Sequence, residues 1–414
     1  MIDLAIYQAR LPDNSGLLDV LMTGGKIVEI RQPGPVIGSK DSIDANGALL
    51  FPGFIDSHTH LDTTGVMPAG ESTTLAQAIQ NYSDYLRNLT PEELAADIKR
   101  RARETLRKAV VAGTTSIRTH VSVDANNGWR SVEAVNELRD EMQPYIDIQI
   151  TAFPVFRGRL DEQQEHFNML DKMARNRLIN AIGGAAHFYD ERIGFTQELF
   201  EIAVKNDLDV DFHIDEHDDP NIDTFLETAR LTLKYNYEGR VSCGHVTALC
   251  RVDDGLAAEA IAMAKEARLH IITLPSCNLY LMARADRQPI PRGVTRIKEF
   301  LEAGVNIAYA SDNVRDPFRP IGNADMLEEG LLTGQVAQML SDSELRVIHR
   351  MGTIHAARAM RLDDYGLAVG KQADLVLIDA SDIVSAYRDQ ATRLAVIKNG
   401  RVVATNQRTS HVTF

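Results

Sequence analysis

The chain has few cysteines, one tryptophan and no long apolar segment. Its three cysteines, Cys243, Cys250 and Cys277, are too few for a disulfide framework, and none belongs to a Cys-x-x-Cys pair. No run approaches the ~18 apolar residues that a membrane-spanning helix needs. The first ten residues lack the basic segment and apolar core of a signal peptide. These absences predict a protein of the reducing cytoplasm.

Basic residues are fewer than acidic residues. The 414 residues include 44 Lys and Arg against 58 Asp and Glu, which gives a formal net charge of −14. Such a surplus of negative charge disfavours binding to nucleic acid and to anionic membrane surfaces. Hydrophobic residues make up 44% and charged residues 25% of the chain, as in an ordinary globular protein. We therefore expect a soluble protein that binds neither nucleic acid nor membranes.

The two ends of the chain share a pattern of short strands and tight turns. Apolar strand-like runs flank Gly24-Gly25 near the N-terminus and Asn399-Gly400 near the C-terminus. An Asn-Gly pair between two such runs is a strong β-hairpin signal. Neither end has enough strands for an independently stable sheet. We therefore predict one small β-sandwich domain built from residues 1–52 and 366–414.

Between these ends, apolar runs alternate with longer helical segments at steps of roughly 30 residues, the length of a β-α unit. The eight runs are residues 48–57, 114–121, 146–153, 178–185, 208–214, 240–244, 270–274 and 305–310. Helix signals agree, since Thr90, Pro91 and Glu93 have the spacing of a capping box with proline at the first helical position. Eight units predict an α/β fold, a (β/α)₈ TIM barrel over residues 53–365. A doubly wound sheet is the alternative that periodicity leaves open.

Side chains that can bind metal stand at the predicted carboxyl ends of four strands. His58 and His60 are two residues apart, so they point to the same side of the first strand. His213 ends the fifth strand, His245 the sixth and Asp312 the eighth. Each alone has a structural explanation, as a buried hydrogen-bonded histidine or a helix N-cap. In a closed barrel these ends converge on the face that carries active sites, and imidazole with carboxylate suits a first-row divalent metal.

Glu216 stands three residues after His213, on the loop that follows the strand. That place suits a general acid or base next to the histidine cluster. A surface charge cluster is the alternative explanation, because residues 216–219 are all polar.

In these segments the chain resembles the amidohydrolase superfamily, and within it the cytosine deaminase branch. The motifs that carry the resemblance are PGFIDSHTHLDTT (52–64), RTHVSVD (118–124), DIQITAFP (147–154), HIDE (213–216), GHVTAL (244–249) and SDNVRDPF (311–318). They follow one another over essentially the whole chain. Residues 365–379 resemble the segment in which that family returns to its β-domain.

The resemblance implies one divalent metal ion, Fe²⁺ or Zn²⁺. Its ligands would be His58, His60, His213 and Asp312. Glu216 matches the proton shuttle of the family, and His245 matches the residue that acts with Asp312 to orient the nucleophile. Two-metal relatives carry a lysine at the end of strand four, and residues 179–187 contain none, which favours a single metal. Family members often form oligomers, so the resemblance also implies a homo-oligomer.

The chain departs from the cytosine deaminases around the substrate. Val155 stands where those enzymes have a glutamine that pairs with the pyrimidine, and Asn313 stands where they have a second aspartate. Phe318 replaces their tryptophan. Losing a hydrogen-bonding group from a pocket built for one can change discrimination by ~10⁴ in favourable cases. These three residues are therefore expected to bind the substrate and to set its identity.

Three further residues are candidates for the substrate pocket. Arg157 can meet a carbonyl or anionic substituent, with a solvated surface position as the alternative. His187 stands at a predicted strand end, and Asn278 follows the seventh strand and is expected to close the pocket. His120, also at a strand end, is either a pocket residue or a structural one.

The combined pattern favours a small-molecule enzyme that deaminates an aminated nitrogen heterocycle, cytosine or a cytosine-like pyrimidine. Asn313 and the run DNVRD also resemble the branch that removes alkylamines from s-triazines, whereas the retained Glu216 favours deamination. Another cyclic C–N bond is the remaining hydrolytic alternative. A non-catalytic metal-bound scaffold would have lost Glu216 or a ligand, and neither is lost. A nucleic-acid deaminase is disfavoured by the charge and by the absence of its His-x-Glu and Pro-Cys-x-x-Cys motifs.

Overall fold

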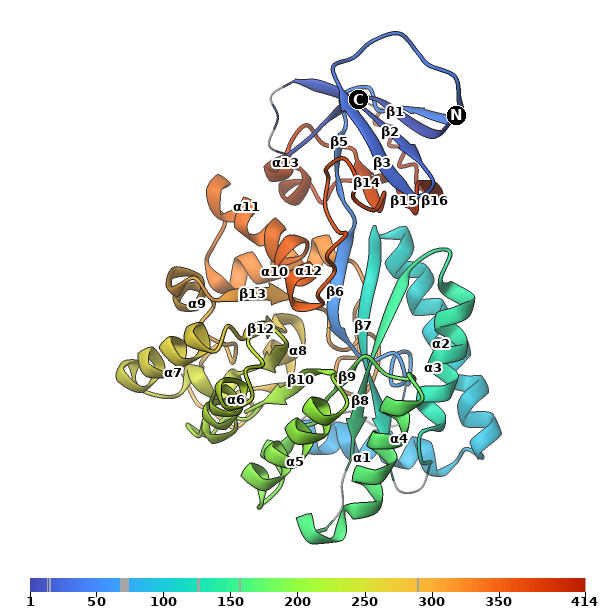
Figure 1. The fold of residues 1–414 in the computed structure, drawn as a ribbon. Helices are drawn as coiled ribbons and strands as arrows, with labels where there is room; N and C mark the ends of the chain where they lie inside the picture. Colours follow the sequence, from blue (N-terminus) through green and yellow to red (C-terminus); the bar gives the residue numbers. More distant parts are fainter. Residues whose placement is uncertain are drawn as a thin grey trace.

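The computed structural model describes residues 1–12, 14, 16–67, 74–124, 127–155, 158–288 and 290–413. It consists of a barrel surrounded by helices and a smaller β-domain, drawn above the barrel in Figure 1. Both chain termini lie in that β-domain. Within the described ranges no helix is long and apolar enough to cross a bilayer.

Eight parallel strands form the barrel and are paired in the order in which they occur in the sequence. They are β6 (Phe54–Thr59), β7 (Thr114–Val123), β8 (Asp147–Pro154), β9 (Ala181–Ile182), β10 (Asp209–Ile214), β11 (Val241–His245), β12 (His270–Thr273) and β13 (Asn306–Tyr309). Thr59, at the end of β6, pairs in parallel with Asp312, just beyond β13. That pairing joins the first strand to the last. The predicted TIM barrel is confirmed, and the doubly wound alternative is wrong.

Helices lie around the outside of the strands (Figure 1). They are α1 (Leu75–Arg87), α2 (Pro91–Val111), α3 (Arg130–Met142), α4 (Gln164–Arg175), α5 (Arg192–Lys205), α6 (Asp223–Lys234), α7 (Asp254–Glu266), α8 (Pro275–Leu281), α9 (Ile297–Ala303), α10 (Met326–Ala337), α11 (Asp342–Met351), α12 (Ile354–Ala359) and α13 (Ile383–Arg388). The predicted capping box is present at the start of α2, where the backbone N–H of Glu93 donates to Thr90 Oγ1 and the backbone N–H of Thr90 donates to Glu93 Oε2.

Two of the predicted barrel strands have different bounds. The predicted first strand, residues 48–57, is divided at Gly53, because β5 (Leu49–Pro52) belongs to the other sheet. A side chain at Gly53 would overlap the side chain of Thr115, so glycine allows this close crossing between the two sheets. The predicted fourth strand, residues 178–185, shrinks to the two residues of β9, since the chain leaves the sheet at Gly183 and Gly184.

The strands from both chain ends form one mixed sheet. They are β1 (Ile2–Arg10), β2 (Leu17–Thr23), β3 (Lys26–Arg31), β4 (Ser39–Asp44), β5, β14 (Leu375–Ile378), β15 (Arg393–Lys398) and β16 (Arg401–Thr405). Met22 of β2 and Ile397 of β15 are far apart in strand order but share one buried apolar core, so the sheet curves around that core. The predicted union of the two ends in one β-domain is confirmed.

Candidate metal and active site

Backbone conformation at the carboxyl ends of the strands aims the functional side chains inward. Asp215, His245 and Asp312 have left-handed φ angles of 45°, 67° and 58°. L-residues adopt this region rarely, and such outliers gather at functional sites. In an extended strand Glu216 would point away from the side that His213 faces. The left-handed turn at Asp215 lets Glu216 line the same cavity as His213.

Barrel closure brings the first and last strands of the site together. The backbone N–H of Asp312 donates to the carbonyl of His58 at 2.9 Å, and the N–H of His60 donates to the carbonyl of Asp312 at 3.0 Å. These backbone bonds hold the three side chains side by side. The same contact therefore closes the barrel and brings together three of the four proposed donor residues.

Three imidazoles and one carboxylate converge at this end of the barrel. His213 Nε2 lies 3.3 Å from His58 Nε2 and 3.1 Å from His60 Nε2. Asp312 Oδ1 lies 3.6 Å from His58 Nε2 and 3.3 Å from His60 Nε2. In the described part of the chain this buried oxygen accepts no hydrogen bond. Ring nitrogens that face one another beside an unsatisfied carboxylate oxygen fit a divalent metal ion, whose ligands would be these four groups.

The charge states of His58, His213 and Asp312 agree with this fit, whereas the pKa of His60 is raised because Asp312 outweighs the effect of burial. Burial, and then the neighbouring histidines, hold the pKa of His58 and of His213 well below the usual value, so both rings are neutral. Burial raises the pKa of Asp312, but His245 and His60 outweigh it and lower that pKa to about 2. Neutral imidazole and ionised carboxylate are the forms in which these side chains bind metals.

Glu216 and His245 form a buried pair next to the donor cluster. Glu216 Oε1 lies 3.1 Å from His245 Nδ1, and His245 Nε2 lies 3.9 Å from Asp312 Oδ2. Asn278 Nδ2 donates to Glu216 Oε1 at 3.3 Å and lies 3.0 Å from His245 Nδ1. Burial, and then the charge of Asp312, raises the pKa of Glu216 well above its usual value. Burial lowers the pKa of His245 to about 4. A carboxyl group that keeps its proton beside a neutral imidazole can carry out acid–base chemistry.

A buried ionic layer lies beneath the cluster and was not predicted. Arg118 Nη1 donates to Asp211 Oδ2 at 3.1 Å, and Asp211 Oδ1 lies 3.5 Å from His120 Nε2. The His120 ring lies 4.0 Å from the His58 ring, centroid to centroid. Asp211 precedes His213 by two residues on β10, so the two side chains face the same side of the strand. This alternation could have predicted the position of Asp211. His120 therefore lies between Asp211 and the His58 ring.

The absence of a side chain at Gly244 leaves the space that the His58 ring occupies. A Cβ at Gly244 would lie 2.8 Å from His58 Cε1 and 3.0 Å from His58 Nδ1. The ring cannot yield easily, because His120 lies against it.

We expect Gly244→Ala to weaken metal binding about 10- to 100-fold, the range found when the supports of metal ligands are disturbed. Competition with a chelator measures this loss. Gly38→Ala is the control, since a Cβ there meets no described atom within 4 Å. Equal metal affinity in both variants would contradict the placement of His58 as a ligand.

The cluster opens into a cavity of about 120 Å³. Its inner end consists of the polar groups described above, and the rest of its wall is largely apolar. The apolar lining residues are Leu75, Ile79, Phe153, Val155, Phe188, Leu281 and Phe318. Leu75 and Ile79 come from α1 and were not predicted, because their pattern is that of any amphipathic surface helix. The cavity suits a small ligand with one polar edge.

The predicted substrate residues have different positions relative to this cavity. Val155, Asn313 and Phe318 line it. The Asn313 amide is already engaged, because its Nδ2 donates to Asp316 Oδ2 at 2.7 Å. Asn278 is turned toward the Glu216–His245 pair.

The other two candidates are His187 and Arg157. His187 is absent from the lining, whereas the next residue, Phe188, belongs to it. Burial lowers the pKa of His187 to about 3, and its ring packs against those of Phe188 and His217. Arg157 lies outside the described residues.

Known proteins resemble the chain along almost its full length. A profile of the amidohydrolase family matches residues 41–134 and 88–404. The chain is 33% identical over 416 residues to N-isopropylammelide isopropyl amidohydrolase of Pseudomonas sp. (strain ADP), with 98% of each chain covered. It is 32% identical over 404 residues to pterin deaminase of Rhizobium rhizogenes, covering 95% of this chain and 89% of that one. 5-Methylcytosine deaminase from Klebsiella pneumoniae, liganded with 5-fluorocytosine, has a TM-score of 0.91 at 28% identity, with 99% of both chains covered.

These matches confirm the resemblance found in the sequence. The two relatives are more than 30% identical over nearly the whole chain, and the solved structure shares both the barrel and the β-domain. The chain belongs to the amidohydrolase family and is an enzyme that hydrolyses a carbon–nitrogen bond.

Proposed function

We propose that the enzyme is a metal-dependent deaminase of an aminated nitrogen heterocycle. The observation that carries this proposal is the Glu216–His245 pair, joined at 3.1 Å, at the edge of a buried donor cluster. The names of two relatives, a pterin deaminase and a 5-methylcytosine deaminase, support the reaction. A small cavity with a polar inner end and apolar walls supports a flat, compact ring as substrate.

The proposed ligands of a single divalent ion, iron or zinc, are His58, His60, His213 and Asp312. When bound, such an ion supplies Lewis acidity and an activated water nucleophile at neutral pH. His245 adds a further buried nitrogen within reach, since one donor atom each of His58, His213, His245 and Asp312 lie within 4.8 Å of one another.

Glu216 is proposed to move the protons. Its raised pKa lets it hold a proton near neutral pH and donate that proton to a ring nitrogen of the substrate. As the tetrahedral adduct collapses, Glu216 takes the proton of the adduct's hydroxyl group and passes it to the departing amine nitrogen, so that ammonia leaves rather than an amide anion. His245 and Asp312 face the same space and orient the attacking water. The amide of Asn278 contacts both Glu216 and His245 and thereby fixes the positions of these two side chains.

The walls of the cavity are proposed to select the substrate. Val155 and Phe318 present apolar surface, and the amide of Asn313 is committed to Asp316. The ring edge that faces these residues therefore needs no strong hydrogen-bonding partner. We propose a cytosine-like pyrimidine or a related fused ring, whose remaining edge lies against apolar side chains. His187 and Arg157 are proposed only as outer contacts of this substrate.

A second candidate reaction is the release of an alkylamine from an s-triazine. The observation that favours it is the 33% identity to N-isopropylammelide isopropyl amidohydrolase over 98% of both chains. Both reactions require an amine-bearing ring carbon near Glu216 and the residues that would hold the metal. They differ in the product, which is ammonia in one case and an alkylamine in the other.

Product identification separates the two candidates. The metal-loaded enzyme is incubated with cytosine, 5-methylcytosine, 5-fluorocytosine, isocytosine, pterin, aminotriazines and N-isopropylammelide, and ammonia and alkylamine are quantified. Ammonia from a pyrimidine or pterin supports the proposed deamination. Isopropylamine without ammonia supports the second reaction and contradicts the first. A ring-opened acid would contradict both.

Val155→Gln is expected to raise kcat/KM for cytosine relative to the other rings by about tenfold. The new amide would offer a donor and an acceptor to the pyrimidine edge, at the position where the cytosine deaminases carry glutamine. Parallel assays over the same panel measure the shift. Val369→Gln, on an exposed loop, is the control. An unchanged ranking of substrates would show that Val155 does not contact the ring.

A further inference from the structure

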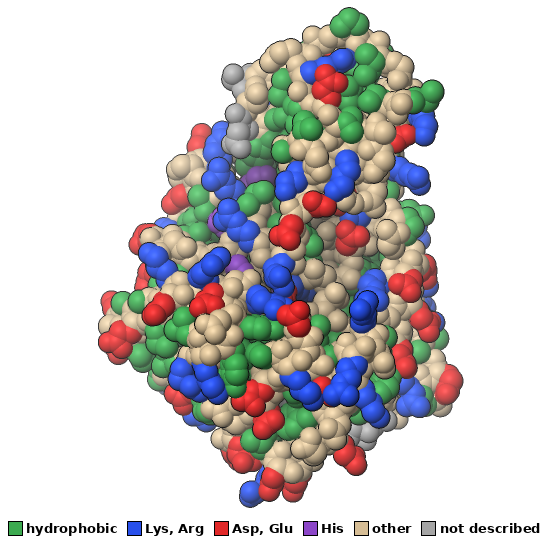
Figure 2. Space-filling view, in the orientation of Figure 1, with side chains coloured by type: hydrophobic (Ala, Val, Ile, Leu, Met, Phe, Trp, Pro, Cys, Tyr) green, Lys and Arg blue, Asp and Glu red, His purple; other side chains and the backbone are tan. Residues whose placement is uncertain are grey.

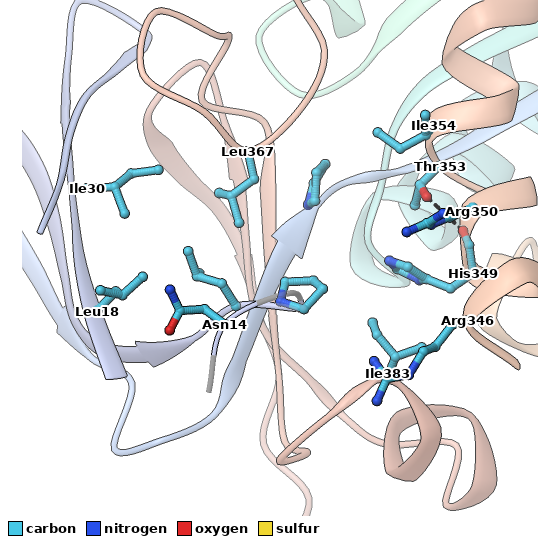
Figure 3. A pocket seen from close by; sticks show the side chains of 13 residues that line it. Asn14, Leu18, Ile30, Arg346, His349, Arg350, Thr353, Ile354, Leu367 and Ile383 are labelled. Carbon is cyan, nitrogen blue, oxygen red and sulfur yellow. Dashed lines mark hydrogen bonds between the residues drawn. The ribbon is translucent and has the colours of Figure 1, made fainter. Parts of the chain in front are cut away.

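A second cavity lies at the seam between the β-domain and the barrel, away from the donor cluster. Its volume is about 400 Å³, and none of its lining residues lines the active-site cavity. Figure 3 shows its two walls facing each other across open space. Leu18, Ile30 and Leu367 come from the β-domain side, and the end of α11 and the start of α12 form the opposite wall.

The α11 wall is positively charged. Arg346 and Arg350 are four residues apart, so they lie on one face of the helix, and both side chains point into the cavity in Figure 3. Neither guanidinium has an ion pair or a side-chain hydrogen bond with any residue that the structure describes. The nearby Asp342 carboxylate is paired instead with Arg388, at 3.7 Å. Figure 2 shows Lys and Arg side chains along the junction between the β-domain and the barrel, with Asp and Glu side chains among them.

His349, between the two arginines in sequence, is a buried polar group that also lines this cavity. The residue is 7% exposed, and its Nδ1 has no hydrogen-bond partner among the described residues. That nitrogen is itself inaccessible to solvent, so it does not reach a molecule in the cavity. The rings of Phe51 and Phe54 pack against the other faces of His349, with centroids 4.8 Å and 6.1 Å away.

Apolar side chains complete the cavity. Leu18, Ile30 and Leu367 face Ile354 of α12 across it (Figure 3). An anion without an apolar part would leave this surface exposed to water. A neutral apolar molecule would leave the two guanidinium groups, both exposed in the structure, without a partner. The lining is therefore complementary to a molecule that has both parts.

We propose that this seam cavity binds a small organic anion, namely an apolar chain or ring that carries one carboxylate or phosphate group. Arg346 and Arg350 hold the anionic head, as guanidinium groups do for planar or tetrahedral oxyanions. The apolar body lies between the β-domain side chains and Ile354. Because the ligand touches both domains, its binding stabilises their junction.

Calorimetric titration of the full-length, metal-loaded enzyme tests this site with three probes that share one alkyl chain: octanoate, octyl phosphate and octanamide. At least one anion is expected to bind with one-to-one stoichiometry, and the tighter of the two identifies the head group. Octanamide is expected to bind about tenfold more weakly, since it lacks the charge. The double variant R346Q/R350Q should weaken anion binding about tenfold or more, whereas R358Q, an exposed arginine on α12 outside the cavity lining, should not.

The double variant should retain the wild-type rate of turnover without probe, because neither arginine touches the active-site cavity. Three results would overturn the proposal. They are no binding of either anion to the wild type, equal affinity of the anion for wild type and double variant, and displacement of the anion by the heterocyclic substrate. The last result would place the probe in the active site.

Discussion

Replacing Glu216 with glutamine is expected to lower kcat/KM about 10²- to 10⁴-fold while the protein keeps its metal. Glutamine has nearly the same shape and can still accept the hydrogen bond from Asn278, which now reaches Glu216 Oε1 at 3.3 Å. It cannot gain or lose a proton. The ring nitrogen of the substrate and the departing ammonia would then have no proton donor. The loss is therefore expected in turnover rather than in folding or metal content.

Steady-state ammonia release and metal analysis of the same protein samples measure these two effects. Glu266→Gln, an exposed change at the end of α7, is the control. If Glu216→Gln kept most of its activity at full metal content, the proton transfer would have to come from another group. If it lost its metal, Glu216 would belong to the donor set and the acid–base assignment would be wrong.

The second large effect is expected for Asp312. Asp312→Ala removes the only carboxylate in the proposed ligand set, whose other members are the imidazoles of His58, His60 and His213. We expect bound metal to fall to a small fraction of one ion per chain and turnover to fall with it. The bonds that close the barrel at this point are backbone bonds to His58 and His60, and alanine retains them. The fold should therefore survive.

Asp312 has a φ of 58°, and alanine in this region costs roughly 1–2 kcal/mol. Asp312→Asn avoids this cost because asparagine tolerates the left-handed conformation, yet it also removes the charge. Loss of metal in both variants, with unchanged circular dichroism, is the expected result. Asp364→Ala, in an exposed loop, is the control. Full metal content in Asp312→Asn and Asp312→Ala would contradict the proposed ligand set.

Much of the fold was predictable because its signals are local. Asn399 and Gly400 have the positive φ angles of 50° and 69° that an Asn-Gly hairpin turn requires, and β15 pairs with β16 as expected. The donor residues could be located because each lies within three residues of the end of an apolar run. Once eight strands are assigned to a barrel, their carboxyl ends share one face.

The remaining features depend on contacts between distant segments. Nothing in the run 48–57 shows that it crosses from one sheet to the other, since the reason is the side chain of Thr115 against Gly53. Arg118 can likewise be buried because its guanidinium donates hydrogen bonds to Gln149 and Asp211, which lie on two other strands. The role of α1 as a wall of the cavity follows from where the helix packs, which its own amphipathic pattern does not specify.

The central claim is tested most directly by comparing metal-stripped and reconstituted enzyme on one heterocycle from the panel. Ammonia release and bound metal are measured in the same samples. The expected result is one metal ion per chain after reconstitution, ammonia release that disappears with a chelator, and recovery when Fe²⁺ or Zn²⁺ is restored. Ammonia release that continues at full rate in the stripped enzyme, with every donor residue intact, would contradict it.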